Sequence, residues 1–216
     1  MTFLTSNKDI LKNAVGPQLD PVPEGPADAL DDFGNIRGDH DLNPASTPPS
    51  DTVYKPAAVL VPIILRAEQP NVILTRRAGH LDKHAGQISF PGGRAEDHDA
   101  TAVDTALRES EEEIGLLASS VDVIGRLNTY LTVTNYSVTP VVGLVEPKVD
   151  LVAEAGEVAE IFEVPLSFLM NPKNHQRHSG FHNGIERFWY AMPYQDYYIW
   201  GATAGMIRDL SERVIK

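Results

Sequence analysis

The pattern of apolar and polar residues changes near residue 53. From Tyr54 onward the chain carries the apolar periodicity of a packed domain. The run Ala57–Leu65 (AAVLVPIIL) is almost continuously apolar, which predicts a strand covered on both faces. A turn-like stretch at Glu68–Asn71 separates this run from the short β-branched run Val72–Thr75. We therefore predict that the two runs form a hairpin.

Strand-like and helical segments follow this hairpin. A Pro-Gly-Gly break at Pro91–Gly93 comes directly after the short segment Gln87–Phe90, and Thr101–Ile114 has helical periodicity. Many strands with only two long helices favour the α+β class, with a mixed sheet between helices rather than a regular βαβ repeat. The remaining predicted strands are Val121–Leu127, Ser137–Val145, Ile161–Val164, Arg187–Ala191 and Tyr197–Trp200, and the remaining helices begin at Leu166–Met170 and span Ala202–Ile215.

The first fifty residues have a different composition. They contain seven of the sixteen prolines and carry eight acids against three bases. We predict an acidic, proline-rich extension at 1–52 and a folded domain at 53–216. One short helix is expected within Ser6–Val15, and Asn43–Asp51 is typical of a linker. The extension is either a partly ordered segment or a lid or dimer-exchange arm, and the sequence leaves both open.

Composition and charge narrow the class of protein. Apolar residues make up 42% of the 216 residues, enough for a sizeable core, and no apolar run approaches the roughly 18–20 residues of a membrane span. The N-terminus lacks the pattern of a secretory signal, and the chain has no cysteine, so we expect a cytoplasmic protein. The net charge of −12 disfavours nucleic acid and acidic membranes as partners. A phosphate-bearing substrate would need local bases and a divalent cation.

The segment Arg108–Leu116 (RESEEEIGL) carries the most informative chemistry. Successive residues of a helix turn by about 100°, so Glu109, Glu112 and Glu113 share one arc of about 100°. Glu111 points away from that arc and should face solvent. A separate stripe, which should face the core, consists of Val103, Ala106, Leu107, Ser110 and Ile114.

This clustering of acids is unfavourable without a ligand. Like charges four residues apart destabilise a helix, and the helix dipole disfavours negative charge near the C-terminal end. A hard divalent cation would reverse both effects, because carboxylate oxygens are its preferred ligands. Arg108 lies close enough in sequence to hold the acids by bidentate hydrogen bonds. The acids of this helix are therefore predicted to form a metal site.

These residues resemble the Nudix hydrolase box, whose terminal pattern is Arg-Glu-x-x-Glu-Glu-x-Gly-apolar. Arg108–Leu116 matches that pattern without a gap. There are two departures: Ser110 replaces an aliphatic residue, and Asp99 stands where a Glu is usual. The fourteen residues between Gly93 and Arg108 are one more than usual.

The one-residue expansion is similar to the coenzyme A pyrophosphatase branch of the Nudix hydrolases. The upstream motif of this branch is similar to Leu74–Ala78 and His84–Gly93. The branch expects Arg where Asp82 stands, in a segment that contacts coenzyme A. The resemblance covers roughly 55–216, and its later segments are Val138–Gly143, Glu157–Val158, Phe162–Leu166 and Ile199–Ala204.

The resemblance implies a Nudix-type α/β/α sandwich and a metal-dependent hydrolase. The implied reaction cleaves the diphosphate of coenzyme A to phosphopantetheine and adenosine 3′,5′-bisphosphate, with Mg²⁺ or Mn²⁺ as cofactor. Arg108 would orient the glutamates, and the general base would be Glu112, Glu113 or Glu157. The implied metal ligands are Glu109, Glu113, Glu112, the Gly93 carbonyl and Glu157, with Glu160 a weaker candidate. The candidate substrate-binding residues are Arg76, Arg77, Lys83, His84, Gln87 and Phe90.

Other interpretations stay open beside this one. The acid at Asp82 motivates a Nudix enzyme for ADP-ribose, NADH or a nucleoside triphosphate, and a third candidate is a Nudix-fold regulator without turnover. A homodimer is one expectation for the oligomeric state. The residues His175, His178 and His182 lack metal-ligand spacing and are expected in a loop, and the aromatic-rich stretch Trp189–Trp200 is expected mostly to pack between strands.

Overall fold

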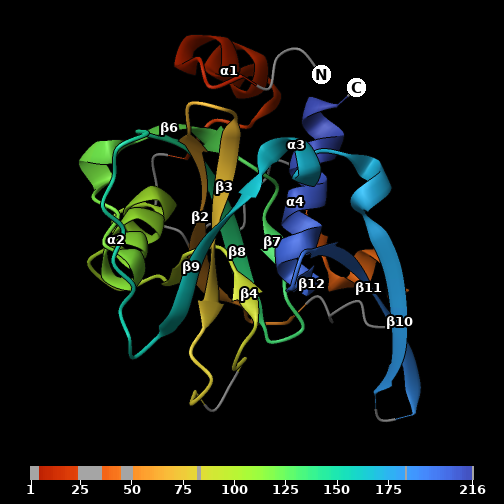
Figure 1. Ribbon diagram of the computed structural model, residues 1–216. Helices are drawn as coiled ribbons and strands as arrows, with labels where there is room; N and C mark the ends of the chain where they lie inside the picture. Colours follow the sequence, from red (N-terminus) through yellow and green to blue (C-terminus); the bar gives the residue numbers. More distant parts are fainter. Residues whose placement is uncertain (1–4, 24–35, 45–50, 82–83, 183, 216) are drawn as a thin grey trace.

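The computed structural model describes residues 5–23, 36–44, 51–81, 84–182 and 184–215. Within these ranges a large mixed sheet lies between helix α2 (Ala102–Ile114) on one face and helix α4 (Gly201–Val214) on the other (Figure 1). This arrangement confirms the predicted α+β class and the α/β/α sandwich. Asp82 and Lys83 lie outside the described residues.

The centre of the sheet is formed by β2 (Lys55–Leu65), β3 (Pro70–Arg77) and β8 (Tyr136–Val145). β2 runs parallel to β8 and antiparallel to β3, so the predicted hairpin is confirmed. The other strands of this sheet are β1 (Arg37–Gly38), β4 (Ile88–Ser89), β5 (Gly92–Arg94), β6 (Val121–Arg126), β7 (Tyr130–Leu131) and β9 (Val158–Pro165). The main strand order is β1-β7-β8-β2-β3-β4, with β5 on β2, β6 on β8 and β9 on β3.

Two apolar clusters, one on each face of the sheet, explain the unbroken apolar run of β2. Ala57, Val61 and Ile63 pack on the side of α4, in the same cluster as the buried residues of that helix. Residues 58, 60 and 64 pack on the side of α2, together with Ala106 and Ile114. The predicted core-facing stripe of α2 is confirmed, because Ala106, Ser110 and Ile114 are fully buried and Val103 and Leu107 pack at its edge.

A second, antiparallel sheet contains β10 (Gln176–His182), β11 (Ile185–Tyr194) and β12 (Tyr197–Trp200). The expectation of a loop was wrong for His178 and His182, which lie in β10 where it pairs with β11, whereas His175 lies outside the strand. The sequence of β10, QRHSGFH, has no apolar alternation, and the strand exists because β11 offers it backbone partners. The helix expected from Leu166 is a single turn, α3 (Leu166–Leu169), and Pro172 begins a separate 3₁₀ turn (Pro172–Asn174).

The described part of the N-terminal segment packs onto the rest of the molecule. The predicted short helix is confirmed as α1 (Lys8–Val15), and its residues Leu11 and Val15 are buried in the α4-side cluster. Asp20 and Arg126 exchange backbone hydrogen bonds in both directions, each 3.0 Å long. The division of the chain at residue 52 stays a proposal. No helix in the described ranges has the length and apolar character needed to cross a membrane.

Candidate metal centre

The acidic helix α2 is fixed at both ends by local hydrogen bonds. The Thr101 hydroxyl caps the N-terminus by accepting from the Asp104 N–H. At the C-terminus Gly115 adopts a left-handed conformation, φ 67°, and its N–H donates to the carbonyls of Ser110 and Glu111. The helix therefore ends directly after its acidic turn, as the sequence predicted.

The acids of this turn differ sharply in exposure. Glu113 is 4% exposed as a residue, and the Glu109 side chain is 16% exposed. Glu111 is exposed, as predicted from its position around the helix. The Glu112 side chain is 61% exposed, although the helical arc grouped it with the two inward-facing acids. Angular position alone did not show that β2 and β5 cover only one side of that arc.

Glu113 is a buried carboxylate. It accepts a 3.1 Å hydrogen bond from the Gly92 N–H, and its Oε1 lies 3.6 Å from Nη1 of Arg77. Burial nevertheless raises the pKa of Glu113 to about 7, because it outweighs the Gly92 hydrogen bond and the charge of Arg77, and the charges of Glu109 and Glu157 raise it further. The site therefore disfavours this negative charge while no cation is bound.

Glu109 packs against the backbone of β5. A Cβ atom added to Gly93 would overlap the Glu109 carboxylate, so the glycine makes room for this side chain. Burial raises the pKa of Glu109, the hydrogen bond from Arg108 opposes that shift, and the charges of Glu112 and Glu157 add to it.

The backbone of Glu157 accepts a 2.8 Å hydrogen bond from the Ala78 N–H. Glu157 is exposed to solvent, but its charge raises the pKa values of both inward-facing glutamates of α2, Glu109 and Glu113.

Arg108 is the hub of the hydrogen bonds around these acids. It donates to both carboxylate oxygens of Asp99 at 3.0 and 2.9 Å, to Glu109 at 2.9 Å and to Glu112 at 3.1 Å. A further bond of 3.1 Å reaches the Arg94 carbonyl. These contacts fit the expectation that Arg108 orients the glutamates.

Asp99 holds the Arg108 guanidinium in place. Its side chain is 2% exposed, and the Arg108 guanidinium holds the pKa of Asp99 well below its usual range, with hydrogen bonds from the Glu96 N–H and the Thr105 hydroxyl acting in the same direction. The sequence marked Asp99 only as a departure from the family pattern. Its position where the box has a Glu was the signal that could have assigned it this role.

The donors fit a hard divalent cation. Within the ranges described above, no three His, Cys, Asp or Glu side chains are already arranged to hold a metal ion. Glu109 is instead turned to Arg108, and Glu113 to the Gly92 N–H. Burial is the main cause of the raised pKa values of both acids, and neighbouring glutamate charges raise them further; a bound cation would favour the ionised forms. The Gly93 carbonyl and Glu157 stay predicted ligands beside them.

The predicted substrate-binding residues do not all lie together. Arg77 reaches Glu113, whereas Arg76 pairs with Glu160, its Nη2 lying 3.5 Å from Oε2. Exposed His84 contacts Gln87, with 2.8 Å between Nδ1 and Oε1. Phe90 is 2% exposed in the α4-side core, so the structure gives it a packing role and does not support direct contact with a substrate. The predicted contact by Lys83 falls outside the described residues.

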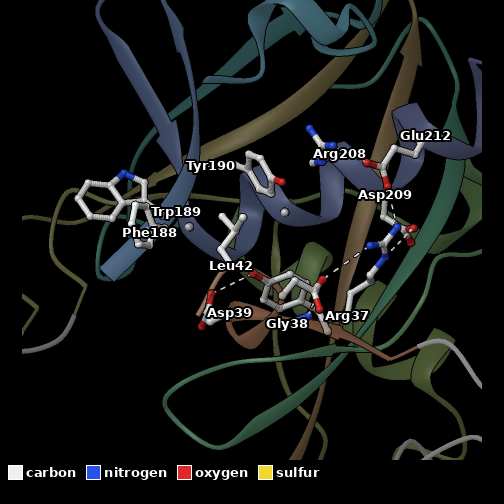
Figure 2. Close-up of a pocket in the computed structure, with 14 residues that line it drawn as sticks. Arg37, Gly38, Asp39, Leu42, Phe188, Trp189, Tyr190, Arg208, Asp209 and Glu212 are labelled. Carbon is white, nitrogen blue, oxygen red and sulfur yellow. Dashed lines mark hydrogen bonds and ion pairs between the residues drawn. The ribbon is translucent and has the colours of Figure 1, made fainter. Parts of the chain in front are cut away.

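A separate cavity of about 180 Å³ lies between the segment that contains Arg37 and helix α4 (Figure 2). Charged side chains that line this cavity pair with one another. Arg37 donates to Glu212 at 2.6 Å, Arg208 lies 2.7 Å from the same carboxylate, and the Tyr130 hydroxyl donates to Asp39 at 2.9 Å. None of the candidate site residues lines this cavity, so α2 remains the better-supported centre.

Comparison with known proteins identifies the family of the chain. The sequence model of the NUDIX domain matches residues 54–183. The chain belongs to the Nudix hydrolase family. A curated Nudix hydrolase, "Uncharacterized Nudix hydrolase NudL" of Escherichia coli strain K12, is 43% identical over 162 residues, which are 74% of this chain and 83% of the relative. The protein of the same name from Shigella boydii serotype 18 has the same identity and coverage.

Solved structures related to this Nudix hydrolase are more distant. A MutT protein from Methanosarcina mazei Go1 is 22% identical, covers 77% of this chain and 96% of its own, and gives a TM-score of 0.47. A MutT/nudix family protein from Enterococcus faecalis is 16% identical, covers 78% and 65%, and gives a TM-score of 0.48. Nudix hydrolases act on small nucleotide-derived substrates and generally use divalent metal ions.

Proposed function

We propose that this Nudix hydrolase cleaves the diphosphate of coenzyme A or its derivatives to phosphopantetheine and adenosine 3′,5′-bisphosphate. One observation carries the proposal: the segment Leu74–Ala78, which resembles the coenzyme A motif, ends at the acidic centre. Arg77 of this segment lies 3.6 Å from Glu113, and the Ala78 N–H donates to the Glu157 carbonyl. The two motifs are therefore adjacent in space although they are separated in sequence.

The side chains at the centre have distinct roles in this proposal. Glu109, Glu112, Glu113, Glu157 and the Gly93 carbonyl would hold Mg²⁺ or Mn²⁺. The cation, when bound, would neutralise diphosphate oxygens and make a water molecule more acidic. Arg108 and Asp99 keep the carboxylates oriented, and Arg77 offers a positive charge to the diphosphate.

The general base is one of three glutamates, Glu112, Glu113 or Glu157. A base must come within hydrogen-bond reach of the attacking water. Glu112 and Glu157 are exposed, which suits contact with water, and Glu113 is buried against Gly92. A cytoplasmic location and a homodimer also stay proposals, the first supported by the absence of cysteine.

A substrate panel tests the proposed reaction. The protein is stripped of metal with a chelator and then incubated with Mg²⁺ or Mn²⁺ and coenzyme A, ADP-ribose, NADH or a nucleoside triphosphate, with products separated by chromatography. We expect phosphopantetheine and adenosine 3′,5′-bisphosphate from coenzyme A, and no product without metal. Turnover of ADP-ribose but not of coenzyme A would refute the proposal that coenzyme A is the substrate. Failure on every substrate with both metals would favour a regulator that keeps the Nudix fold.

A further inference from the structure

An extra residue, Ala159, interrupts the pairing of β9 with β3. Arg76 lies opposite Glu160, but the next residue, Arg77, lies opposite Val158, so β9 contains a bulge. Side chains alternate between the two faces of a strand, and a bulge reverses that alternation beyond it. Val158 is accordingly buried in the α2-side cluster, whereas Glu160 faces β12 on the α4 side.

Arg76 and Arg77 point to opposite faces of the sheet, because consecutive residues of β3 alternate, and the bulge in β9 gives each arginine a partner on its own face. Nη1 of Arg77 lies 3.6 Å from Oε1 of Glu113, on the α2 side of the sheet. Nη2 of Arg76 lies 3.5 Å from Oε2 of Glu160, and its guanidinium carbon is 5.1 Å from the ring centre of Tyr197. Only the second arginine of the pair therefore reaches the acidic centre.

Tyr197, in β12 of the second sheet, contacts both Arg76 and Glu160. Its hydroxyl donates to Oε1 of Glu160 at 2.7 Å, and its ring stacks on Phe162 with 3.7 Å between centroids and 3° between planes. The hydrogen bond to the carboxylate raises the pKa of Tyr197, so the hydroxyl remains a neutral donor. Three strands, β3, β9 and β12, are thus joined at the bulge by a charge-assisted hydrogen bond, an ion pair and two ring contacts.

The backbone beyond the bulge holds the acidic centre together. The Ala78 N–H donates to the Glu157 carbonyl at 2.8 Å, and the Arg77 N–H donates to the Gln87 carbonyl at 2.9 Å. A shift of β3 against β9 would therefore move the predicted ligand Glu157 and the loop that carries Gln87 together.

We propose that Tyr197 and Glu160 are positioning residues of the metal centre. By anchoring Arg76 they fix the bulge, and the bulge holds Arg77 and Glu157 beside the buried carboxylate of α2. The proposal rests on the proposed metal centre but is independent of which substrate is cleaved. It also replaces the weaker expectation that Glu160 binds the metal, because this carboxylate is engaged on the opposite face of the sheet.

The test removes one oxygen atom. Tyr197→Phe keeps the ring stack and deletes the hydroxyl. We expect the Mn²⁺ affinity, measured by titration calorimetry, and kcat on whichever substrate is cleaved each to fall about tenfold, the size of one charge-assisted hydrogen bond, with KM changed less than about twofold. Tyr198→Phe is the matched control, since that hydroxyl contacts His178 and Trp189 instead and should leave both quantities unchanged.

A second background separates positioning from general loss of structure. If Tyr197 acts through Arg76, Tyr197→Phe introduced into an Arg76→Met protein should cost less than about twofold further, because coupled residues are not additive. A full tenfold loss in both backgrounds would overturn the proposal, as would unchanged Mn²⁺ binding by Tyr197→Phe alone. Failure of the unaltered protein to bind Mn²⁺ would instead refute the metal centre.

Discussion

Glu113 offers the sharpest quantitative test of the centre, because its charge is unfavourable in the metal-free fold. The pKa of Glu113 is raised from 4.5 to about 7. Each pKa unit corresponds to about 1.4 kcal/mol, so the ionised carboxylate costs the fold about 3 kcal/mol above neutral pH. An acid with a raised pKa contributes stability below its unfolded value, and that stability is lost as the pH rises through the folded value. Stability without metal should therefore fall between pH 4.5 and about 7.

Glu113→Gln removes this charge and keeps an oxygen for the Gly92 N–H. In the presence of a chelator, we compare the free energies of unfolding of the variant and the unaltered protein. We expect the variant's advantage to increase by about 2 kcal/mol from about pH 5.5 to about pH 8.5. Urea unfolding followed by tryptophan fluorescence measures the difference, which corresponds to a midpoint shift of about 1 M. With Mg²⁺ or Mn²⁺ and substrate, the same variant should lose at least about a hundredfold in turnover.

Glu111→Gln is the control for Glu113→Gln, because it removes the same charge from an exposed position on the same helix. It should change stability by less than about 0.5 kcal/mol at either pH and leave turnover nearly unchanged. Equal effects of the two substitutions, or a gain by Glu113→Gln that does not depend on pH, would refute the conclusion that Glu113 is held in a desolvated site.

Three further predictions probe the surroundings of the centre. Gly93→Ala should displace the carboxylate packed against it and lower turnover about tenfold or more with little loss of stability, whereas Gly79→Ala, where a Cβ meets open space, should match the unaltered protein in the same assay. Asp99→Asn should lower the free energy of unfolding, measured with urea at neutral pH, by about 2–3 kcal/mol. Because the pKa of Asp99 is lowered, the difference between variant and unaltered protein should shrink as the pH falls below 3.8. A difference that stays constant with pH would argue against the charged pair of Asp99 and Arg108. Leu11→Ala should cost about 2–4 kcal/mol and Ile10→Ala less than about 0.5 kcal/mol, because the first side chain is fully buried and the second is 51% exposed; equal costs would show that α1 is not part of the core.

The parts of the fold that follow periodicity were predictable from sequence. The helical spacing of Ala106, Ser110 and Ile114 gave the buried stripe of α2, and the apolar run of β2 gave a strand covered on both faces. Short or polar strands were not predictable. β1 and β7 are two residues each and are defined by their partners, and β10 carries almost no apolar signal.

The grouping of acids on α2 was predictable from the sequence, but the burial of each acid was not. Glu112 and Glu113 are neighbours in sequence, yet one is exposed and the other buried, because strands distant in sequence cover only one of them. Phe90 followed the family pattern, but its side chain packs in the core. The alternation of β3 already separates Arg76 from Arg77, but their partners could not be predicted, because the bulge that places Glu160 opposite Arg76 and Val158 opposite Arg77 lies in β9, some eighty residues later in the chain.

The bulge at Ala159 makes the centre sensitive to chain length as well as to residue type. A deletion of this one residue would leave every other side chain in the same order along the chain. It would nevertheless turn Val158 away from its own core and shift Glu157 relative to α2. Relatives that lack a residue here would need a compensating change elsewhere in β9. We therefore expect a one-residue gap at this position to be a better sign of an altered candidate metal centre than several substitutions on the surrounding surface.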